Sequence, residues 1–142
     1  MKSKLVLLCA PIAISLFLLA CSPAPKQVSV DASCDDFTGV QHISKEVQID
    51  IGDSLTVALC SNPTTGFQWS ELAQISDPSI LEQTRQEYVP PEDEGIVGAP
   101  GKEIWTFEAL KKGTCSVSME YSRPWEGGEQ EEWTFTLTVV VK

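Results

Sequence analysis

The feature that most constrains this chain is an alternation of apolar and polar residues with a period of two, which dominates from residue 45 onward. Such alternation places one face of a β-strand on a core and the other face in solvent. Seven short segments carry the pattern, with turn-forming residues between them, over residues 45–51, 55–59, 67–69, 80–89, 105–109, 117–121 and 133–141. No convincing helical stretch accompanies them. The sequence therefore predicts an all-β fold, an antiparallel β-sandwich of about seven strands.

Turn signals predict how some of these strands connect. Gly52-Asp53 lies between the first two segments, so we expect those two strands to form a hairpin. Pro90-Pro91 opens a long glycine-containing loop that includes residues 95–102. Tryptophans at 69, 105 and 133 fall in the strands and are expected in or against the core, whereas Trp125 falls in a loop.

The first 20 residues have the layout of a signal peptide: Lys2 and Lys4, then an apolar run, with no acidic residue. The run from residue 5 to residue 20 is shorter than the roughly 20 apolar residues that a spanning helix needs. Leu18-Leu19-Ala20-Cys21 resembles the lipobox of bacterial lipoproteins, which implies that Cys21 is lipidated and becomes the new N-terminus. The alternative is an ordinary signal peptide that happens to end before a cysteine.

This resemblance implies an exported protein, anchored to the cell envelope membrane by Cys21. Residues 1–20 are then the signal peptide, residues 21–42 the lipidated cysteine and a flexible tether, and residues 43–142 the folded domain. Without the signal peptide all 20 acidic residues remain but only eight of the ten basic ones, a net charge near -12. Nucleic acid is therefore excluded as a partner, because phosphate contacts need clustered Lys and Arg.

Export changes how the cysteines are interpreted, since an oxidising compartment permits disulfides. Cys34, Cys60 and Cys115 remain in the exported part. Cys60 closes the second predicted strand, whereas Cys115 opens the sixth, roughly 20 Å away along the strand direction. Cys34 precedes the first strand, at the edge where the second strand ends. Cys34–Cys60 is the better pair, which leaves Cys115 as a small core residue.

The sequence offers little for catalysis. His42 is the only histidine, and no local motif supports a nucleophile beside it, so we interpret it as a loop residue. Recognised spacings of metal ligands and phosphate-binding glycine loops are absent from the sequence. We therefore expect no enzyme activity, no metal and no cofactor.

Two loop segments have the chemistry of a binding surface. Asn62-Pro63-Thr64-Thr65-Gly66-Phe67 joins the second and third strands, and its proline, β-branched threonines and glycine favour a rigid conformation that loses little entropy on docking. Arg123-Pro124-Trp125 emerges at the same edge and holds two residue types enriched in binding hot spots. The alternatives are a merely rigid turn in the first case and, in the second, a Trp folded back on the sandwich with Arg on a neighbouring acid.

These segments resemble the chagasin-type inhibitors of papain-like cysteine proteases. Residues 62–67 match the first-loop motif of that family at every position, and residues 123–125 match its third-loop motif. Gly98-Ala99-Pro100-Gly101 stands where the middle loop has Gly-x-Gly-Gly, with Pro100 in place of a glycine. The resemblance covers about residues 43 to 142.

The resemblance implies an immunoglobulin-like fold in which loops 62–67, 95–102 and 123–126 fill the cleft of a papain-like protease, reversibly and without covalent chemistry. The implied contact residues are Asn62, Pro63, Thr64, Thr65, Gly66, Phe67, Gly98, Gly101, Arg123, Pro124 and Trp125. The expected partners are such a protease and the membrane, and the domain is expected to be a monomer. The alternative is a non-inhibitory immunoglobulin-like binding module of an exported lipoprotein.

Overall fold

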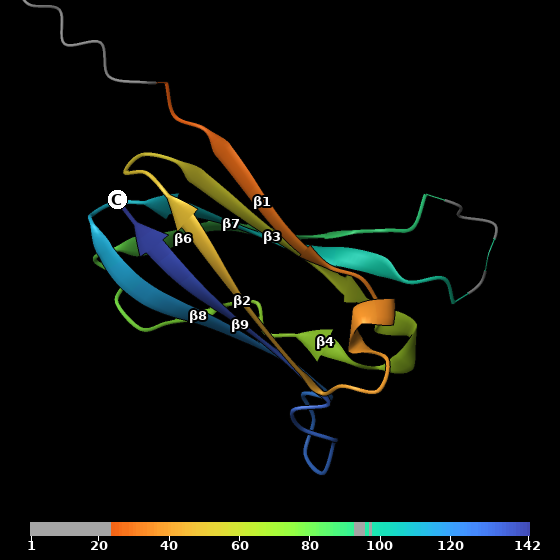
Figure 1. Cartoon of the computed structure of the whole chain (residues 1–142). Coiled ribbons are helices and arrows are strands. Elements are labelled where there is room, and N and C mark those ends of the chain that lie inside the picture. The colour runs from red at the N-terminus through yellow and green to blue at the C-terminus, as the bar shows by residue number, and fades with distance from the viewer. Residues whose placement is uncertain (1–23, 93–95, 97) are drawn as a thin grey trace, which may run out of the picture.

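The computed structural model describes residues 24–92, 96 and 98–142, which form a sandwich of two β-sheets (Figure 1). One sheet has the order β1-β3-β7-β6 and the other the order β2-β9-β8-β4, with β5 also paired to β8. The nine strands of this described part are β1 (Gln27–Ala32), β2 (His42–Ile49), β3 (Ser54–Ser61), β4 (Gln68–Trp69), β5 (Gln74–Ile75), β6 (Leu81–Val89), β7 (Gly101–Ala109), β8 (Gly113–Ser122) and β9 (Trp133–Val141).

The predicted all-β sandwich is confirmed, and two short 3-10 turns, η1 (Asp35–Phe37) and η2 (Pro63–Thr65), are the helical elements of the described residues. Two strands more than predicted are present, β1 and β5. Most neighbouring strands are antiparallel, but β1 runs parallel to β3 and β2 runs parallel to β9. No helix within the described ranges is long and apolar enough to cross a membrane.

The predicted hairpin between residues 45–51 and 55–59 is wrong. The chain does turn there, but β2 and β3 belong to different sheets. The connection is held by the Asp53 carboxylate, which accepts hydrogen bonds from the backbone N–H of Lys26 at 2.8 Å and of Asp50 at 2.9 Å. The Lys26 bond is the main reason that the pKa of Asp53 lies below its ordinary value. Alternation fixes which face of a strand is buried, but not which strand is its neighbour.

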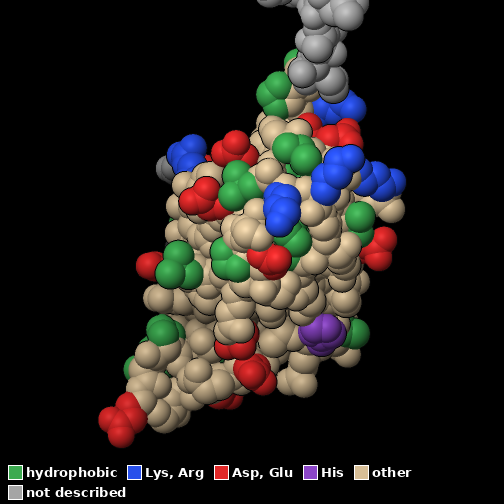
Figure 2. Space-filling model, turned by 90° about the vertical axis from the view of Figure 1, so that its left-hand side faces the viewer, with side chains coloured by type: hydrophobic (Ala, Val, Ile, Leu, Met, Phe, Trp, Pro, Cys, Tyr) green, Lys and Arg blue, Asp and Glu red, His purple; other side chains and the backbone are tan. Residues whose placement is uncertain are grey.

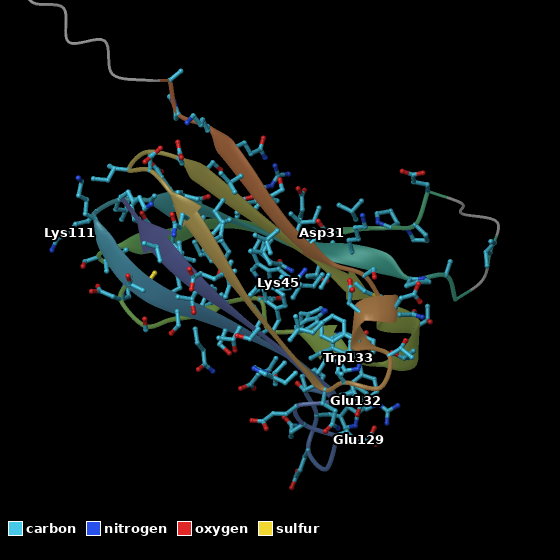
Figure 3. The ribbon with its side chains drawn as sticks, in the orientation of Figure 1. Asp31, Lys45, Lys111, Glu129, Glu132 and Trp133 are labelled. Atoms are coloured by element: carbon cyan, nitrogen blue, oxygen red, sulfur yellow. A yellow bond between two sulfur atoms is a disulfide. The ribbon has the colours of Figure 1, made fainter. Side chains whose placement is uncertain are left out.

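The C-terminal part of the predicted tether needs correction, because residues 27–42 belong to the folded domain. In β1, Val28 and Val30 pack against the core, and the register runs from Gln27 opposite Ser54 to Ala32 opposite Leu59. Lys45 on β2 donates a hydrogen bond to the carbonyl of Asp31, so β1 is also fastened to the other sheet (Figure 3). The domain therefore begins near residue 26, and His42 is the first residue of β2 rather than a loop residue.

The core lies between the sheets and is rich in aromatic residues. Trp105, Phe107 and Phe135 are fully buried, and Trp69 is 4% exposed. A row of stacked rings runs along one side of this core: Phe37 and Trp133 have centroids 4.7 Å apart, Trp133 and Tyr121 4.9 Å, and Tyr121 and Phe67 5.4 Å. Each stacked pair adds stability beyond the burial of its area. The row connects η1 to the loop that follows β3.

The predicted disulfide between Cys34 and Cys60 is confirmed, with Cα atoms 5.1 Å apart. It joins the start of η1 to the end of β3. Cys115 is a free, buried cysteine on β8, and burial is the main cause that raises the pKa of its thiol. A buried, protonated thiol packs as a small apolar group.

Replacing Cys34 and Cys60 together by alanine should lower the free energy of unfolding by about 3 kcal/mol, because a cross-link spanning 26 residues restricts the unfolded chain. Urea denaturation of a fragment of residues 24–142, without reductant, measures the change. Wild type in the presence of reductant is the control and should show a similar loss. Denaturation curves that superimpose for the variant and the oxidised wild type would contradict the prediction.

Candidate functional site

The loop of residues 62–67, here called the first loop, is held by its own side chains. Asn62 precedes η2, and its side-chain oxygen accepts hydrogen bonds from the N–H of Thr64 at 3.3 Å and from the hydroxyl of Thr64 at 2.6 Å. The Thr65 hydroxyl donates to the carbonyl of Asn62 at 2.7 Å. These bonds satisfy polar groups that a free loop would leave to water, while Pro63, Thr64 and Thr65 stay exposed. The predicted rigid loop is therefore present, with its threonines at the surface.

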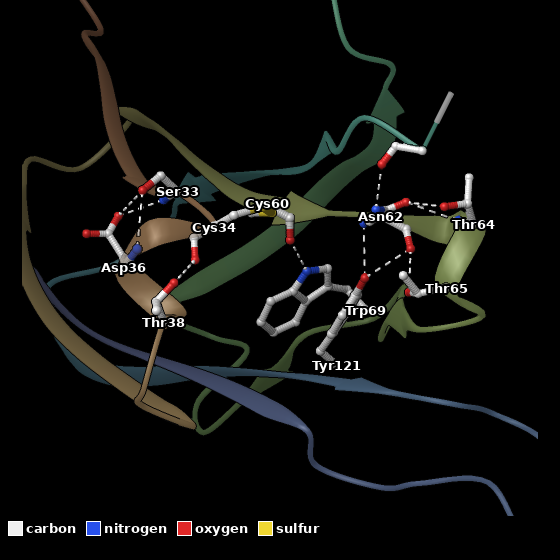
Figure 4. The surroundings of a disulfide bond; sticks show 11 residues. Ser33, Cys34, Asp36, Thr38, Cys60, Asn62, Thr64, Thr65, Trp69 and Tyr121 are labelled. Atoms are coloured by element: carbon white, nitrogen blue, oxygen red, sulfur yellow. Dashed lines mark hydrogen bonds between the residues drawn. A yellow bond between two sulfur atoms is a disulfide. The ribbon is translucent and has the colours of Figure 1, made fainter. Parts of the chain in front are cut away.

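The base of the first loop is tied to the core by Tyr121 and Trp69 (Figure 4). The N–H of Asn62 donates to the hydroxyl of Tyr121 at 3.0 Å. The indole N–H of Trp69 donates to the carbonyl of Cys60 at 2.8 Å. Because both aromatic side chains are buried, the loop is positioned by groups that cannot move without disturbing the core.

The loop of residues 123–126, here called the third loop, lies against the first. The Arg123 guanidinium is 4.4 Å from the centroid of the Phe67 ring and donates a hydrogen bond to the carbonyl of Thr65 at 3.3 Å. It also forms an ion pair with Glu129 at 2.6 Å. Arg123 therefore does pair with a neighbouring acid, as one of the sequence interpretations had it, and the same side chain fastens the two loops together.

Trp125 is 52% exposed, and its ring covers Gly66. Gly66 has φ of 83°, in the left-handed region that favours glycine. A Cβ at Gly66 would lie 2.7 Å from Cη2 of Trp125, so only glycine allows this contact. Trp125 thus rests on the first loop and keeps about half of its surface for a partner.

The loop of residues 95–102, here called the middle loop, contacts the first loop through Gly98. The Asn62 side-chain amide donates to the carbonyl of Gly98 at 2.9 Å, and Gly98 is exposed. Gly101 is different: it is buried at the start of β7, and a Cβ there would lie 2.3 Å from the carbonyl oxygen of Val89. Gly101 is an implied contact residue, but its burial keeps it from a partner, and the glycine instead allows the close pairing of β6 with β7. Gly95 lies outside the described residues.

The three predicted segments therefore meet at one end of the sandwich, with the first loop in the centre. Acidic side chains flank the third loop, and Figure 3 shows Glu129 and Glu132 beside Trp133 at this end. Sequence reasoning missed the residues that position the loops, above all Tyr121 and Glu129. The signal for Tyr121 was its place at the end of an alternating strand, two residues before Arg123.

The described residues contain no cluster of His, Cys, Asp and Glu able to hold a metal ion. The imidazole of His42 is hydrogen-bonded through Nδ1 to the Thr134 hydroxyl at 2.6 Å. Cys115 lies buried in the core and the other two described cysteines form the disulfide. This end of the molecule therefore presents rigid, exposed loops that are suited to binding a partner.

Residues 48–139 match the family described as Chagasin family peptidase inhibitor I42, which is more than half of the chain. The chain belongs to this family. Chagasin of Trypanosoma cruzi is 31% identical over 98 residues, which cover 68% of this chain and 88% of that protein. Amoebiasin-2 of Entamoeba histolytica is 30% identical over 96 residues, which cover 68% of this chain and 76% of that protein.

Solved structures share the fold of this chain. The crystal structure of the cysteine protease inhibitor EhICP2 from Entamoeba histolytica has a TM-score of 0.65 and 24% identity, over 85% of this chain and all of that chain. PbICP-C, solved in complex with falcipain-2, has a TM-score of 0.53 and 16% identity, over 82% of this chain and 99% of that chain. The sandwich is thus of the immunoglobulin-like type. Since the chagasin family consists of inhibitors, the prediction that the chain is not an enzyme is confirmed.

Replacing Gly66 by valine should push the Trp125 ring off the first loop without unfolding the domain. The strained φ should cost about 1–2 kcal/mol of stability. Gly52→Val is the matched control, because Gly52 has φ of 84° and nothing within 4 Å of its Cβ position. Urea denaturation should show similar losses in both variants, whereas tryptophan emission and near-ultraviolet circular dichroism should change in Gly66→Val alone. Identical spectra for the two variants would show that Trp125 does not rest on Gly66.

Proposed function

We propose that this chain is a reversible, non-covalent inhibitor of papain-like cysteine proteases that blocks the active-site cleft with its three loops. The observation that carries the proposal is the binding of both flanking loops to the first loop, through Asn62 to Gly98 and through Arg123 to Thr65. Membership of a family of peptidase inhibitors, and the cysteine protease inhibitor among its structural neighbours, support the same activity.

Within this proposal the first loop occupies the catalytic centre, with Thr64, Thr65 and Gly66 nearest the reacting groups. The hydrogen bonds within the loop hold it in a single turn, so its peptide bonds are kept from the extended geometry that attack by a thiolate requires. The same rigidity reduces the entropy lost on binding. Trp125 and Pro124, both exposed, lie to one side of the first loop and contact the enzyme beyond its catalytic groups.

A fragment of residues 24–142 should inhibit papain or a cathepsin L-like protease at submicromolar concentration. It keeps β1, which a fragment starting at Ser33 would lose. Absence of inhibition at micromolar concentration would contradict the proposal and favour a non-inhibitory binding module.

Trp125→Ala should weaken inhibition by about 2 kcal/mol, a roughly 30-fold rise in Ki, because an exposed tryptophan on a rigid support is a typical hot spot. Ile51→Ala is the control, since Ile51 is 49% exposed, close to the 52% of Trp125, and belongs to the opposite end of the sandwich. An unchanged Ki for Trp125→Ala would show that the third loop is not part of the interface.

We also propose that the chain is an exported lipoprotein held at a membrane by lipidated Cys21. Its described part begins at the end of the sandwich opposite the three loops, because Gln27 pairs with Ser54 at the start of β3. Four lysines belong to that end: Lys26, Lys111, Lys112 and Lys142. In Figure 2 the visible basic side chains gather in the upper half of the face, toward the end where the described chain begins. An anionic membrane surface would attract this end of an otherwise acidic protein and leave the loops outward.

The variant Cys21→Ser should move the full chain from the membrane fraction to the soluble fraction when both forms are produced in a bacterial host. The thioether and acyl groups require the cysteine sulfur and the amine that cleavage exposes. Incorporation of labelled palmitate, measured on the full chain, should be lost in this variant and retained in Cys9→Ser. Equal labelling of Cys21→Ser and wild type would contradict lipidation at this residue.

A further inference from the structure

A pocket of about 310 Å³ lies at the seam of the two sheets, next to the first loop. Here the edge strand β6 of one sheet faces β4 and the segment after it in the other sheet. The side chain of Gln83 bridges the seam, since it accepts from the N–H of Ala73 and donates to the carbonyl of Glu71, both at 2.8 Å. The residues that line this seam pocket are Ser61, Pro63, Gln68, Trp69, Glu71, Gln86, Tyr88 and Glu103.

Two carboxylates give the seam pocket its charge. Glu103 on β7 is half-buried and accepts a hydrogen bond from the amide of Gln86 on β6. Burial is the main cause that raises the pKa of Glu103, and the negative charge of Glu71 raises it further. Neither carboxylate belongs to an ion pair within the described residues. The pocket therefore contains negative charge that its own walls do not neutralise.

Ser61 adds an independent observation. Its side chain is among the most buried in the molecule, with the residue 1% exposed, yet its hydroxyl oxygen has no hydrogen-bond partner. The hydroxyl lies close to the Glu103 carboxylate, since it lowers the pKa of that group. A buried hydroxyl without a partner is destabilising, so its free lone pairs are an acceptor site for a donor from outside the chain.

We propose that the seam pocket receives a basic side chain, an arginine or lysine, from the protease that the three loops bind. Two carboxylates and the Ser61 oxygen offer acceptors to a guanidinium or ammonium group, and the rings of Trp69 and Tyr88 offer apolar walls to its stem. The inference rests on the proposed function, because Pro63 of the first loop forms part of the pocket wall and brings the bound enzyme beside it.

Other occupants fit less well. An anion would be repelled by Glu71 and Glu103, and an apolar group would leave both carboxylates and Ser61 without partners. A divalent cation needs more ligands than the two carboxylates provide, and the described residues contain no metal-binding cluster. A single positive charge on a long, partly apolar stem matches both the charge and the walls.

The seam pocket would therefore select among proteases. An enzyme with a basic residue at the matching position of its cleft rim gains an ion pair in a half-buried site. An enzyme with an acidic residue there is repelled by Glu71 and Glu103. Selectivity then comes from the side of the first loop away from Trp125.

The test uses the double variant Glu71→Gln/Glu103→Gln of residues 24–142, which removes both charges and keeps the side-chain shapes. Its Ki should rise at least 10-fold for the enzyme that wild type inhibits most strongly, and the Ki should depend less on salt concentration. The matched control is Glu82→Gln/Glu108→Gln. These two residues are opposite each other on β6 and β7 at the other end of the same strand pair, so the control removes the same charge outside the pocket.

Equal Ki values for wild type and the double variant, or equal losses in the double variant and its control, would overturn the inference. Failure of wild type to inhibit any papain-like enzyme would overturn the proposed function as well, so the two failures are distinguishable. If the double variant melts at a much lower temperature than wild type, the single variant Glu71→Gln replaces it, because Glu71 is exposed.

A second measurement needs no enzyme. Butylguanidine, a guanidinium on an aliphatic stem, should shift the backbone amide resonances of Ser61 and Glu103 in a saturable way when it is titrated into the labelled wild-type fragment. The double variant should show no saturable shift. Butylurea, which has the same stem and no charge, should also leave the wild-type resonances unchanged. A wild-type spectrum that butylguanidine does not change would overturn the inference.

Discussion

The row of stacked rings from Phe37 through Trp133 and Tyr121 to Phe67 is the interaction on which the loop end depends. It begins under η1, runs through the partly buried side of the core, and ends beneath the Arg123 guanidinium. The Tyr121 ring stacks within the row while its hydroxyl receives the N–H of Asn62. Tyr121 therefore packs in the core with its ring and positions the first loop with its hydroxyl. A loop that rests on a close-packed core has little conformational freedom. Such rigidity suits an inhibitor that fills the protease cleft without reacting with it.

The loops form a single unit in which the first loop is the common partner. Asn62 caps its own turn and reaches the middle loop, while Thr65 accepts the guanidinium of the third loop. Among the described residues, each flanking loop is thus positioned by its hydrogen bond to the first loop. Substitutions in the middle loop, where Pro100 replaces an expected glycine, can then change its reach without displacing Trp125.

Much of this could be predicted from the sequence, because alternation and short motifs are local properties. The strands β6 and β9, the exposed loop tryptophan and the Cys34–Cys60 pair follow from residues read in order. The pairing of β2 with β9 instead of β3 could not be predicted, since alternation does not identify a neighbour. Strand β1 was missed because its apolar positions are few and lie in a segment of small and polar residues. The seam pocket depends on the distance between two sheet edges, which no single segment encodes.

The disulfide has a mechanical consequence. A pull on the chain at residue 24 loads the hydrogen bonds between β1 and β3 in shear, along the length of both strands. Beyond Ala32 the load reaches Cys34 and crosses to Cys60, two residues before Asn62, by covalent bonds alone. The stretch between the two cysteines, which are 26 positions apart, is bypassed. If the N-terminus is anchored as proposed, tension between the membrane and an enzyme bound to the first loop is carried by this short covalent path.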